Sequence, residues 1–307
     1  MAISRAQMMK ELLPGLNALF GLEYAQYEDE SQAVYETESS DRAFEEEVKL
    51  AGFGAAPVKS EGAGINYDTA QETFTARYNH ETIAMGFAIT EEAVEDNLYD
   101  SVSARYTKAL ARAMSHTKQV KAAFPLNNAY DAAQFTAGDG IMLCNATTHV
   151  DINGTPIPNC LTTPADLNET SLEQAVIDIA AFTDDRGLII AARPKRIIIA
   201  PYNQFVATRI LDSEQRPGTA DNDINALRNN GTIPEGYSVN HFLTTGAKKF
   251  WFVMTDVPNG MKHFTRTPLQ TGMDGDFDTG NVRYKARERY SFGVSDYLGI
   301  FGSGDIT

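Results

Sequence analysis

The stretch TEEAVEDNLYDSVSARYTKALARAMSHTKQVKAAF, residues 90–124, decides the fold. Thr90 is a suitable N-cap, and the apolar residues after it recur at the three- and four-residue intervals of one helix face. Neither glycine nor proline interrupts this pattern before Pro125. At about 1.5 Å per residue, the stretch predicts a helix roughly 50 Å long, more than a small domain needs. We therefore expect a strut along which other elements lie.

The composition is that of a folded protein with a large negative charge. Of 307 residues, 43% are hydrophobic and 22% are charged, so the chain can bury a core. The formal net charge of -15 disfavours general binding to nucleic-acid phosphates, so any such contact must be local. No apolar run approaches the ~20 residues that cross a bilayer, and no secretory signal is present. We expect no membrane association, and two free thiols at Cys144 and Cys160.

The first 47 residues change character midway. Residues 23–47 hold ten acidic side chains and one base, Arg42, interleaved with tyrosine and phenylalanine. A purely solvated acidic tail would leave these rings exposed to water. We interpret residues 1–47 as an arm that orders on another surface.

The next segment predicts a long two-stranded excursion. A glycine-rich stretch around residues 50–68 is followed by two extended runs up to residue 90. A hairpin of this kind has too few apolar residues to bury a core of its own. It is therefore a second segment that needs a partner surface.

An α/β lobe is predicted for the middle of the chain, from about residue 165. Thr170 and Glu173 stand in capping-box spacing, which predicts a helix that ends at Gly187. The runs LIIAA (188–192) and RIIIA (196–200) predict buried strands, and residues 203–213 a further helix. Two β-type runs follow within residues 237–256. Because a long strand comes after this lobe, we expect the lobe to be an insertion.

That long strand is RYKARERYSF, residues 283–292. Its basic residues share one parity and its apolar residues mostly the other, which is the two-residue period of a strand. A nucleic-acid site is one interpretation, although the aromatic rings point away from the cations and cannot stack bases between them. A carboxylate-rich neighbour is the favoured partner, and the arm at residues 23–47 supplies such a surface.

The residue patterns predict no catalytic, cofactor or metal site. The histidines are scattered, and the one pair formed by Cys144 and His149 falls short of a zinc site. The acidic turn at residues 274–280 begins like a calcium loop, but Thr279 and Lys285 occupy its glycine and glutamate positions. An enzyme finds no support beyond the α/β lobe, and a fold alone does not establish activity.

Several motifs in fixed order resemble the major capsid proteins of tailed bacteriophages, which have the Hong Kong 97-type fold. The resemblance runs from about residue 35 to residue 303. The motifs are GFAITEEAVEDNLYD (86–100), AAFPLNNAYD (122–131), AGDGIMLC (137–144), SLEQAV (171–176), RIIIAP (196–201), PGTADNDINALR (217–228) and DYLGIFGS (296–303).

This resemblance implies an α+β fold with a defined order of parts. They are an N-terminal arm (1–47), an E-loop that reaches over a neighbouring subunit (48–80), a peripheral domain (81–164) with a spine helix (90–124), an inserted α/β axial domain (165–279) and a return to the peripheral domain (280–307).

The resemblance also implies a structural function and its partners. Copies of the chain would form the hexamers and pentamers of an icosahedral head around double-stranded DNA, without sequence-specific binding, after assembly in the cytoplasm of a bacterial host. A portal protein and a separate scaffolding protein are expected, because the arm starts almost at once where some relatives carry a long scaffolding segment. A decoration protein is compatible with this scheme.

Candidate inter-subunit contacts lie in the arm, the E-loop and the basic strand. Some relatives cross-link an E-loop lysine to an asparagine with the help of a glutamate, but only the lysine, Lys59, has a counterpart here, so we expect non-covalent shells. The alternative function is a nucleic-acid-binding protein that uses residues 283–289. The candidates are Glu28, Asp29, Glu30, Glu45, Glu46, Glu47, Lys59, Arg283, Lys285, Arg287 and Arg289.

Overall fold

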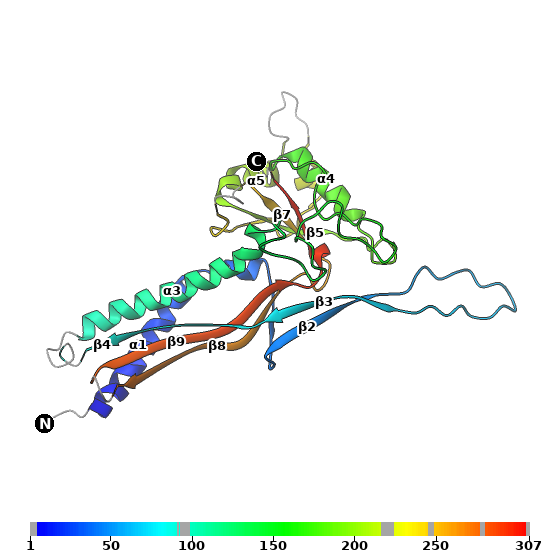
Figure 1. Ribbon diagram of the computed structural model, residues 1–307. Helices are drawn as coiled ribbons and strands as arrows, with labels where there is room; N and C mark the ends of the chain where they lie inside the picture. The colour runs from blue at the N-terminus through cyan, green and yellow to red at the C-terminus, as the bar shows by residue number, and fades with distance from the viewer. Residues whose placement is uncertain are drawn as a thin grey trace.

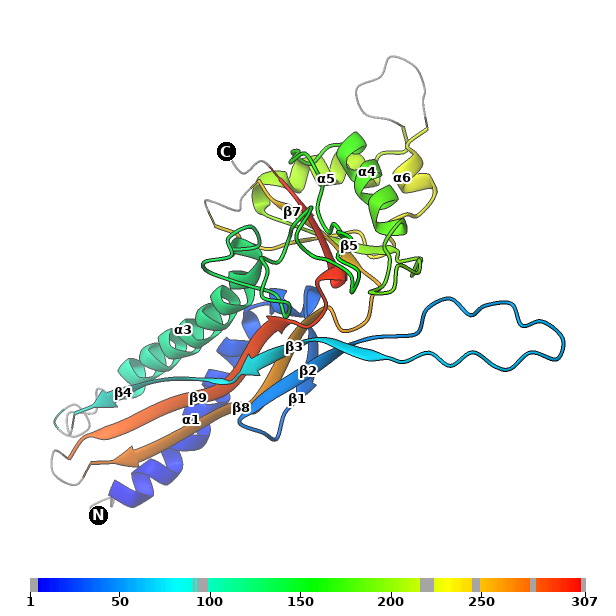
Figure 2. The same cartoon turned by 45° about the vertical axis from the view of Figure 1, so that its right-hand side comes forward.

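The computed structural model describes residues 5–90, 92, 99–215, 224–244, 249–276 and 280–304. These residues form a mixed α+β structure with two four-stranded sheets and a separate two-stranded hairpin (Figure 1). One sheet carries two long helices on one face, the other lies in an α/β lobe, and the hairpin projects from the region between them (Figure 2).

The first sheet is built on the long strand that the sequence predicted. The two long strands β8 and β9 pair antiparallel, β4 pairs antiparallel with β9, and β1 pairs parallel with β8. Across the sheet the order is β1 (Glu36–Ser39), β8 (Met261–Gly275), β9 (Val282–Val294) and β4 (Glu81–Ile89).

The predicted strut is helix α3 (Tyr99–Asn127), which lies along one face of this sheet (Figure 1). The predicted end at residue 124 is wrong, because the helix continues through Pro125 to Asn127. A proline here removes one hydrogen bond of the last turn, where the cost to the helix is small. The predicted start lies next to residues 91 and 93–98, which are outside the described residues.

The N-terminal arm finds its partner surface within its own chain. Helix α1 (Arg5–Gln26) packs beside α3, and the short helix η1 (Glu30–Ala33) and strand β1 continue across the sheet. Leu16 and Phe20 of α1 are buried against α3 and the inner face of β9.

Strands β2 (Phe44–Ala51) and β3 (Gln71–Asn79) form the predicted hairpin. Beyond them, residues 52–70 extend from the body without strand hydrogen bonds (Figures 1 and 2). Phe74, Ala76 and Tyr78 root β3 on the body, since Phe74 packs against the lobe core and Tyr78 against Phe264. The excursion is therefore anchored at its base and free at its tip.

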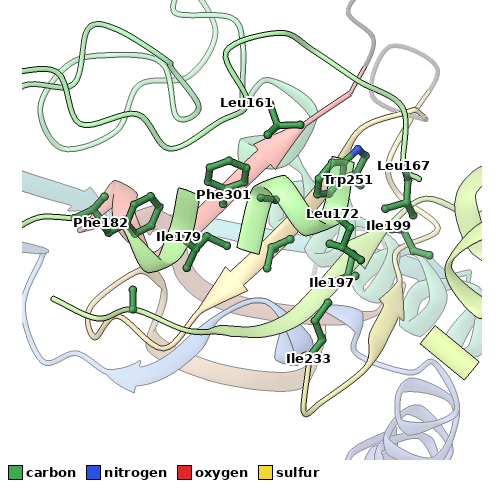
Figure 3. Close-up of a cluster of buried hydrophobic side chains, with 14 of the residues drawn as sticks. Leu161, Leu167, Leu172, Ile179, Phe182, Ile197, Ile199, Ile233, Trp251 and Phe301 are labelled. Carbon is green, nitrogen blue, oxygen red and sulfur yellow. The ribbon is translucent and has the colours of Figure 1, made fainter. Parts of the chain in front are cut away.

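The predicted α/β lobe is present, with helices α4 and α5 over its sheet. The order across the sheet is β10 (Ile300–Ser303), β7 (Trp251–Thr255), β5 (Pro194–Ile199) and β6 (Tyr237–Val239). Helices α4 (Glu169–Ala180), α5 (Gln204–Asp212) and α6 (Ala226–Asn229) complete it, with the short helices η2 (Pro201–Asn203) and η3 (Tyr297–Gly299). Figure 3 shows its core, in which Leu172 and Ile179 of α4 face Ile197, Trp251 and Phe301.

Two local predictions in this lobe are wrong. Helix α4 is capped by Asn168, which forms a reciprocal capping box with Ser171, and it ends at Ala180 rather than at Gly187. Residues 188–192 form no strand, because Ala191 has a φ of 52° and the left-handed backbone breaks the extended run. Ile189 is consequently exposed at the surface.

The boundary expected at residue 280, between the inserted domain and the return to the peripheral domain, separates strands that pair in the same sheet. Strand β8, placed in the inserted domain, pairs along its length with β9 of the first sheet. Strand β10, placed in the final return, pairs with β7 in the lobe. A long hairpin keeps β8 and β9 together, and η3 then carries the chain across to the lobe.

Phe20→Ala tests the docking of α1. Removing this buried ring should destabilise the unassembled chain by about 3–5 kcal/mol, because it leaves a cavity between α1, α3 and β9. Leu22→Ala is the matched control, since Leu22 lies on the same helix with 69% of its surface exposed, and it should change stability by less than ~0.5 kcal/mol. Urea unfolding measures both changes, and equal effects of the two variants would contradict the docked helix.

Candidate assembly surfaces

The predicted basic face of β9 is present as a row of exposed cations. Arg283, Lys285 and Arg287 are exposed, whereas Val282, Tyr284 and Ala286 between them are buried. Tyr284 and Ala286 pack in one cluster with residues of α1 and α3, so the cations lie on the face of the sheet without helices. We call Arg283, Lys285, Arg287 and Arg289 the basic row.

Small residues flank the basic row. Ala84, Gly86 and Ala88 of β4 and Gly272 of β8 stand opposite its cations in the sheet register. Arg283 forms an ion pair with Asp276, but no ion pair joins Lys285 or Arg287 to another of the described residues. The row is therefore accessible to a partner from outside the chain.

Arg289 differs from the other members of the row. It is only partly exposed, and its Nε atom is buried without a hydrogen-bond partner among the described residues. Lys285 and Arg287 are consequently the better positions at which to reverse charge without disturbing the fold.

Four of the six acidic candidates of the arm and hairpin bind other basic side chains within the chain. Asp29 lies 3.0 Å from Lys118 Nζ, Glu30 contacts His241, Glu46 pairs with Arg77 and Glu47 with Lys262. Glu45 accepts a hydrogen bond from Ser40 at 2.6 Å, and Glu28 is exposed. Within one chain, the structure brings none of these carboxylates to the basic row.

Lys59 lies at the exposed tip of the hairpin, in a loop that presents large apolar side chains to water. Val58 is 99% exposed, and Phe53, Ile65 and Tyr67 are exposed as well. Exposure of several such residues on one unsupported loop is typical of an interaction site.

A groove of about 670 Å³ lies along α3 on another part of the surface. It runs between α3 and the ends of β4 and β9, and most of its lining is apolar. Its apolar walls are Val120, Phe124, Pro125, Phe135 and Phe292.

Sequence reasoning missed a buried polar cluster beneath the arm. Glu288 belongs to the buried parity of β9 and is only 5% exposed, and its carboxylate is hydrogen-bonded to Tyr24 of α1. Burial raises the pKa of Glu288 to about 7, against the opposing charge of Lys118. The alternation of β9 could have indicated this residue, since it is the one charged side chain on the parity of Tyr284 and Tyr290.

Other groups around Glu288 are incompletely paired. Glu288 Oε1, Gln119 Oε1, His263 Nε2 and the Tyr290 hydroxyl are buried, and no hydrogen-bond partner is found for them among the described residues. Burial would raise the pKa of Asp29, but hydrogen bonds from Ser31 and the charge of Lys118 lower it to about 2. The cluster thus joins the arm to α3 and β9 with more acid than base.

No cluster of three or more metal-binding side chains occurs in the described part of the chain. A family model described as phage capsid protein matches residues 72–302. The chain belongs to this family. No curated protein matches the sequence.

Solved capsid structures share the fold at low sequence identity. The capsid of an empty GTA particle is 12% identical, with a TM-score of 0.57 and coverage of 92% of this chain and 91% of that chain. The virus-like particle from Pyrococcus furiosus is 7% identical, with a TM-score of 0.54 and coverage of 95% and 99%. The capsid of Myoviridae phage XM1 is 13% identical, with a TM-score of 0.52 and coverage of 88% of each chain.

These findings confirm the Hong Kong 97-type fold predicted from the sequence motifs. The protein is a phage major capsid protein, a structural component of a capsid rather than an enzyme. None of its described helices combines the length and apolar character that spanning a membrane requires.

Glu288→Gln tests the ionisation of the buried cluster. Because the carboxyl has a pKa of about 7 when folded and an ordinary value of 4.5 when unfolded, the unfolded chain loses this proton first as pH rises. The wild-type free energy of unfolding should therefore carry a contribution that falls between these two values and is fully lost above pH 7. The variant lacks this contribution. Its free energy of unfolding relative to wild type should therefore rise by up to ~3 kcal/mol between acidic and alkaline pH.

Urea unfolding of both proteins across this pH range measures the difference. Burial lowers the pKa of His263 from 6.5 to about 4, so the free energy of unfolding also falls as pH drops below 6.5. This contribution is present in wild type and in Glu288→Gln alike, so it cancels when the two proteins are compared. Stability curves that run parallel at all pH values would contradict the buried, ionisable Glu288.

Proposed function

We propose that this capsid protein assembles as hexamers and pentamers into the icosahedral head of a tailed bacteriophage that encloses double-stranded DNA. Family membership and the shared capsid fold support this proposal. The observation that carries it is the apolar loop at residues 52–70, which projects from the body and has no core of its own. In a closed shell each copy can place this loop on a neighbour and receive one in turn.

The parts of the chain then take the positions that the resemblance implies. Residues 1–47 act as the arm, the hairpin as the E-loop, the first sheet with α3 as the peripheral domain and the α/β lobe as the axial domain. Assembly takes place in the cytoplasm of the bacterial host with a scaffolding protein and a portal protein, and a decoration protein can bind the finished shell. Since no partner for a cross-link to Lys59 is identified, the contacts between subunits are non-covalent in this proposal.

The receiving surface in this proposal is the groove beside α3. Its apolar walls, including Val120 and Phe124, match the exposed Val58, Ile65 and Tyr67 in character. A knob on one surface and a hollow on another give a head-to-tail contact, which closes into a ring when the rotation between copies permits.

Electron microscopy with light scattering on the purified protein, alone and with the proteins encoded beside it, tests the assembly. Shells, capsomer rings or tubes are expected. The double variant Val58→Ser with Tyr67→Ser should lose them, because burial of two such side chains contributes roughly 3 kcal/mol per contact, about 100-fold in association.

Leu22→Ser is the matched control for that variant, since it removes an exposed apolar side chain outside the loop. Circular dichroism should be unchanged in both variants. Normal shells from the loop variant would refute the role of the loop, and a wild-type chain that stays monomeric with all its neighbours would refute the proposed assembly.

We further propose that the basic row contacts acidic segments of adjacent subunits. The arm is the first candidate, with exposed Glu28 as the carboxylate that has no partner in the described part of its own chain. Asp29, Glu30, Glu46 and Glu47 would have to exchange the partners that they hold within one chain. The alternative function, binding to nucleic acid, is favoured by the same exposed cations at Lys285 and Arg287.

Lys285→Glu combined with Arg287→Glu separates these two functions. If the row contacts other subunits, the variant should fold normally and fail to assemble, and the unassembled wild-type chain should bind DNA fragments no better than the variant. If the row binds nucleic acid, the wild-type chain should bind fragments with a steep salt dependence that the variant lacks. The charge-preserving pair Lys285→Arg with Arg287→Lys should behave as wild type in both assays.

A further inference from the structure

An open cleft separates the root of the hairpin from the α/β lobe. Its volume is about 730 Å³, and its walls come from β2 on one side and from the loops around Asp185, Asp256 and Asp296 on the other. Phe74 of β3 packs on the lobe core beside the cleft, whereas β2 faces the lobe across it. Contacts across the cleft must fix the angle of the hairpin here.

Lys49 of β2 reaches across this cleft to two carboxylates. Its Nζ atom lies 3.1 Å from both carboxylate oxygens of Asp296 and 3.6 Å from Asp185 Oδ1. The same ammonium lies 4.7 Å from the centre of the Tyr297 ring, within the range of a cation–π contact. All the charged side chains of this group are largely buried, so the attraction is weakly screened.

The surface that receives Lys49 is itself held rigidly. His149 stacks on the Tyr297 ring, with 3.9 Å between ring centres and an interplanar angle of 9°. The Nδ1 atom of His149 is in turn hydrogen-bonded to Asp139 Oδ2 at 2.5 Å. Asp296 also caps η3, accepting a hydrogen bond from Leu298 N. Lys49 thus binds the short segment that joins the two sheets.

The hairpin is irregular at this same place. Lys49 pairs with Phe74 and Leu50 with Glu72, so the register shifts here and the extra residue, Thr73, lies on β3, as in a β-bulge. A bulge bends its strand, and the hairpin leaves the body directly beyond it.

Ala76 and Tyr78 of β3 provide an apolar pivot. Besides this pivot and the Lys49 ammonium, the base of the hairpin is held by Glu47 of β2, which binds Lys262, and by Arg186 of the lobe, which donates to Gly52 O at 3.1 Å and to Thr69 O at 2.6 Å.

Small rotations about this pivot become large at the tip. The loop 52–70 adds some nine residues on each strand, a reach of about 30 Å at ~3.3 Å per residue. A tilt of about 10° would then move the tip by roughly 5 Å, which is enough to take an apolar side chain out of its groove.

We propose that Lys49 is a positioning residue for assembly, which fixes the angle at which the 52–70 loop leaves the body and so where its tip meets another copy of the chain. The second half of this statement rests on the proposed shell assembly, whereas the first half concerns a single chain. Removing Lys49 takes away the attraction that draws β2 towards Asp185 and Asp296, so the cleft should open.

Distances between spin labels in the unassembled protein test the single-chain half. Labels are placed at Ile65→Cys in the loop and Ile177→Cys on α4, which are 70% and 62% exposed, while the native cysteines are buried. Lys49→Met should shift or broaden the distance distribution by about 5 Å or more, from the lever of about 30 Å. Lys59→Met, which removes a lysine from the exposed tip of the same hairpin, should leave the distribution as in wild type.

An unchanged distribution in Lys49→Met would overturn the proposal, whatever the protein assembles into. If that variant does not fold, Lys49→Gln with Asp296→Asn removes the cation and one carboxylate together, and it should show the same shift. No shift in that folded pair would equally overturn the proposal.

Particle diameters test the assembly half. Electron microscopy of Lys49→Met should show irregular or heterogeneous particles, where wild type gives one size. If the Lys49→Met variant instead forms uniform shells of the wild-type diameter, the link to assembly is overturned. If wild type forms no shells at all, the proposed function fails while the label distances still decide the role of Lys49 in the hairpin.

Discussion

The two-residue alternation along β9 is the constraint on which the rest of the structure depends. One parity, with Tyr284 and Ala286, supplies the surface on which α1 and α3 pack. The other parity, with Lys285 and Arg287, remains at the surface. A shift of one residue in the pairing with β4 and β8 would bury cations under the helices and expose the core, so the register is strongly fixed.

The hairpin follows a different physical logic from the two packed bodies. Its tip buries nothing within one chain, so its apolar side chains contribute no stability until a partner covers them. A capsid subunit can tolerate this because many copies repeat the same contact. A closed shell then gains from every loop at once, while a single loop contact can remain weak enough to break and re-form during assembly.

How far the sequence predicted the structure depended on whether each signal was local. The strut helix and the alternation of β9 were confirmed, because both are periodic over many residues. The strand expected at 188–192 was wrong, since nothing in its composition indicates the left-handed backbone at Ala191. The boundary at residue 280 was wrong because pairing of β8 with β9 and of β10 with β7 is tertiary.

The candidate surfaces show the same division. Exposure of Lys285 and Arg287 followed from parity and was predicted. The partners of Asp29 and Glu47 are Lys118 and Lys262, which lie 89 and 215 residues away in the sequence, so no local pattern could indicate them. Glu288 was missed because its burial depends on Tyr24 and the arm above it, although its parity already set it apart.

The two cores and the two polar joints differ in how readily they can rearrange. The cores of the lobe and of the helix-covered sheet consist of interlocked apolar side chains, for which intermediate positions leave costly voids. The joints at Lys49 and at Glu288 instead bring more carboxylates than cations together in places of low exposure. Changing one charge there alters the balance of the whole joint. The lobe and the helix-covered sheet are thus fixed by packing. The hairpin and the arm combine apolar anchors, Phe74 and Tyr78 in the one and Leu16 and Phe20 in the other, with the charged joints at Lys49 and Glu288.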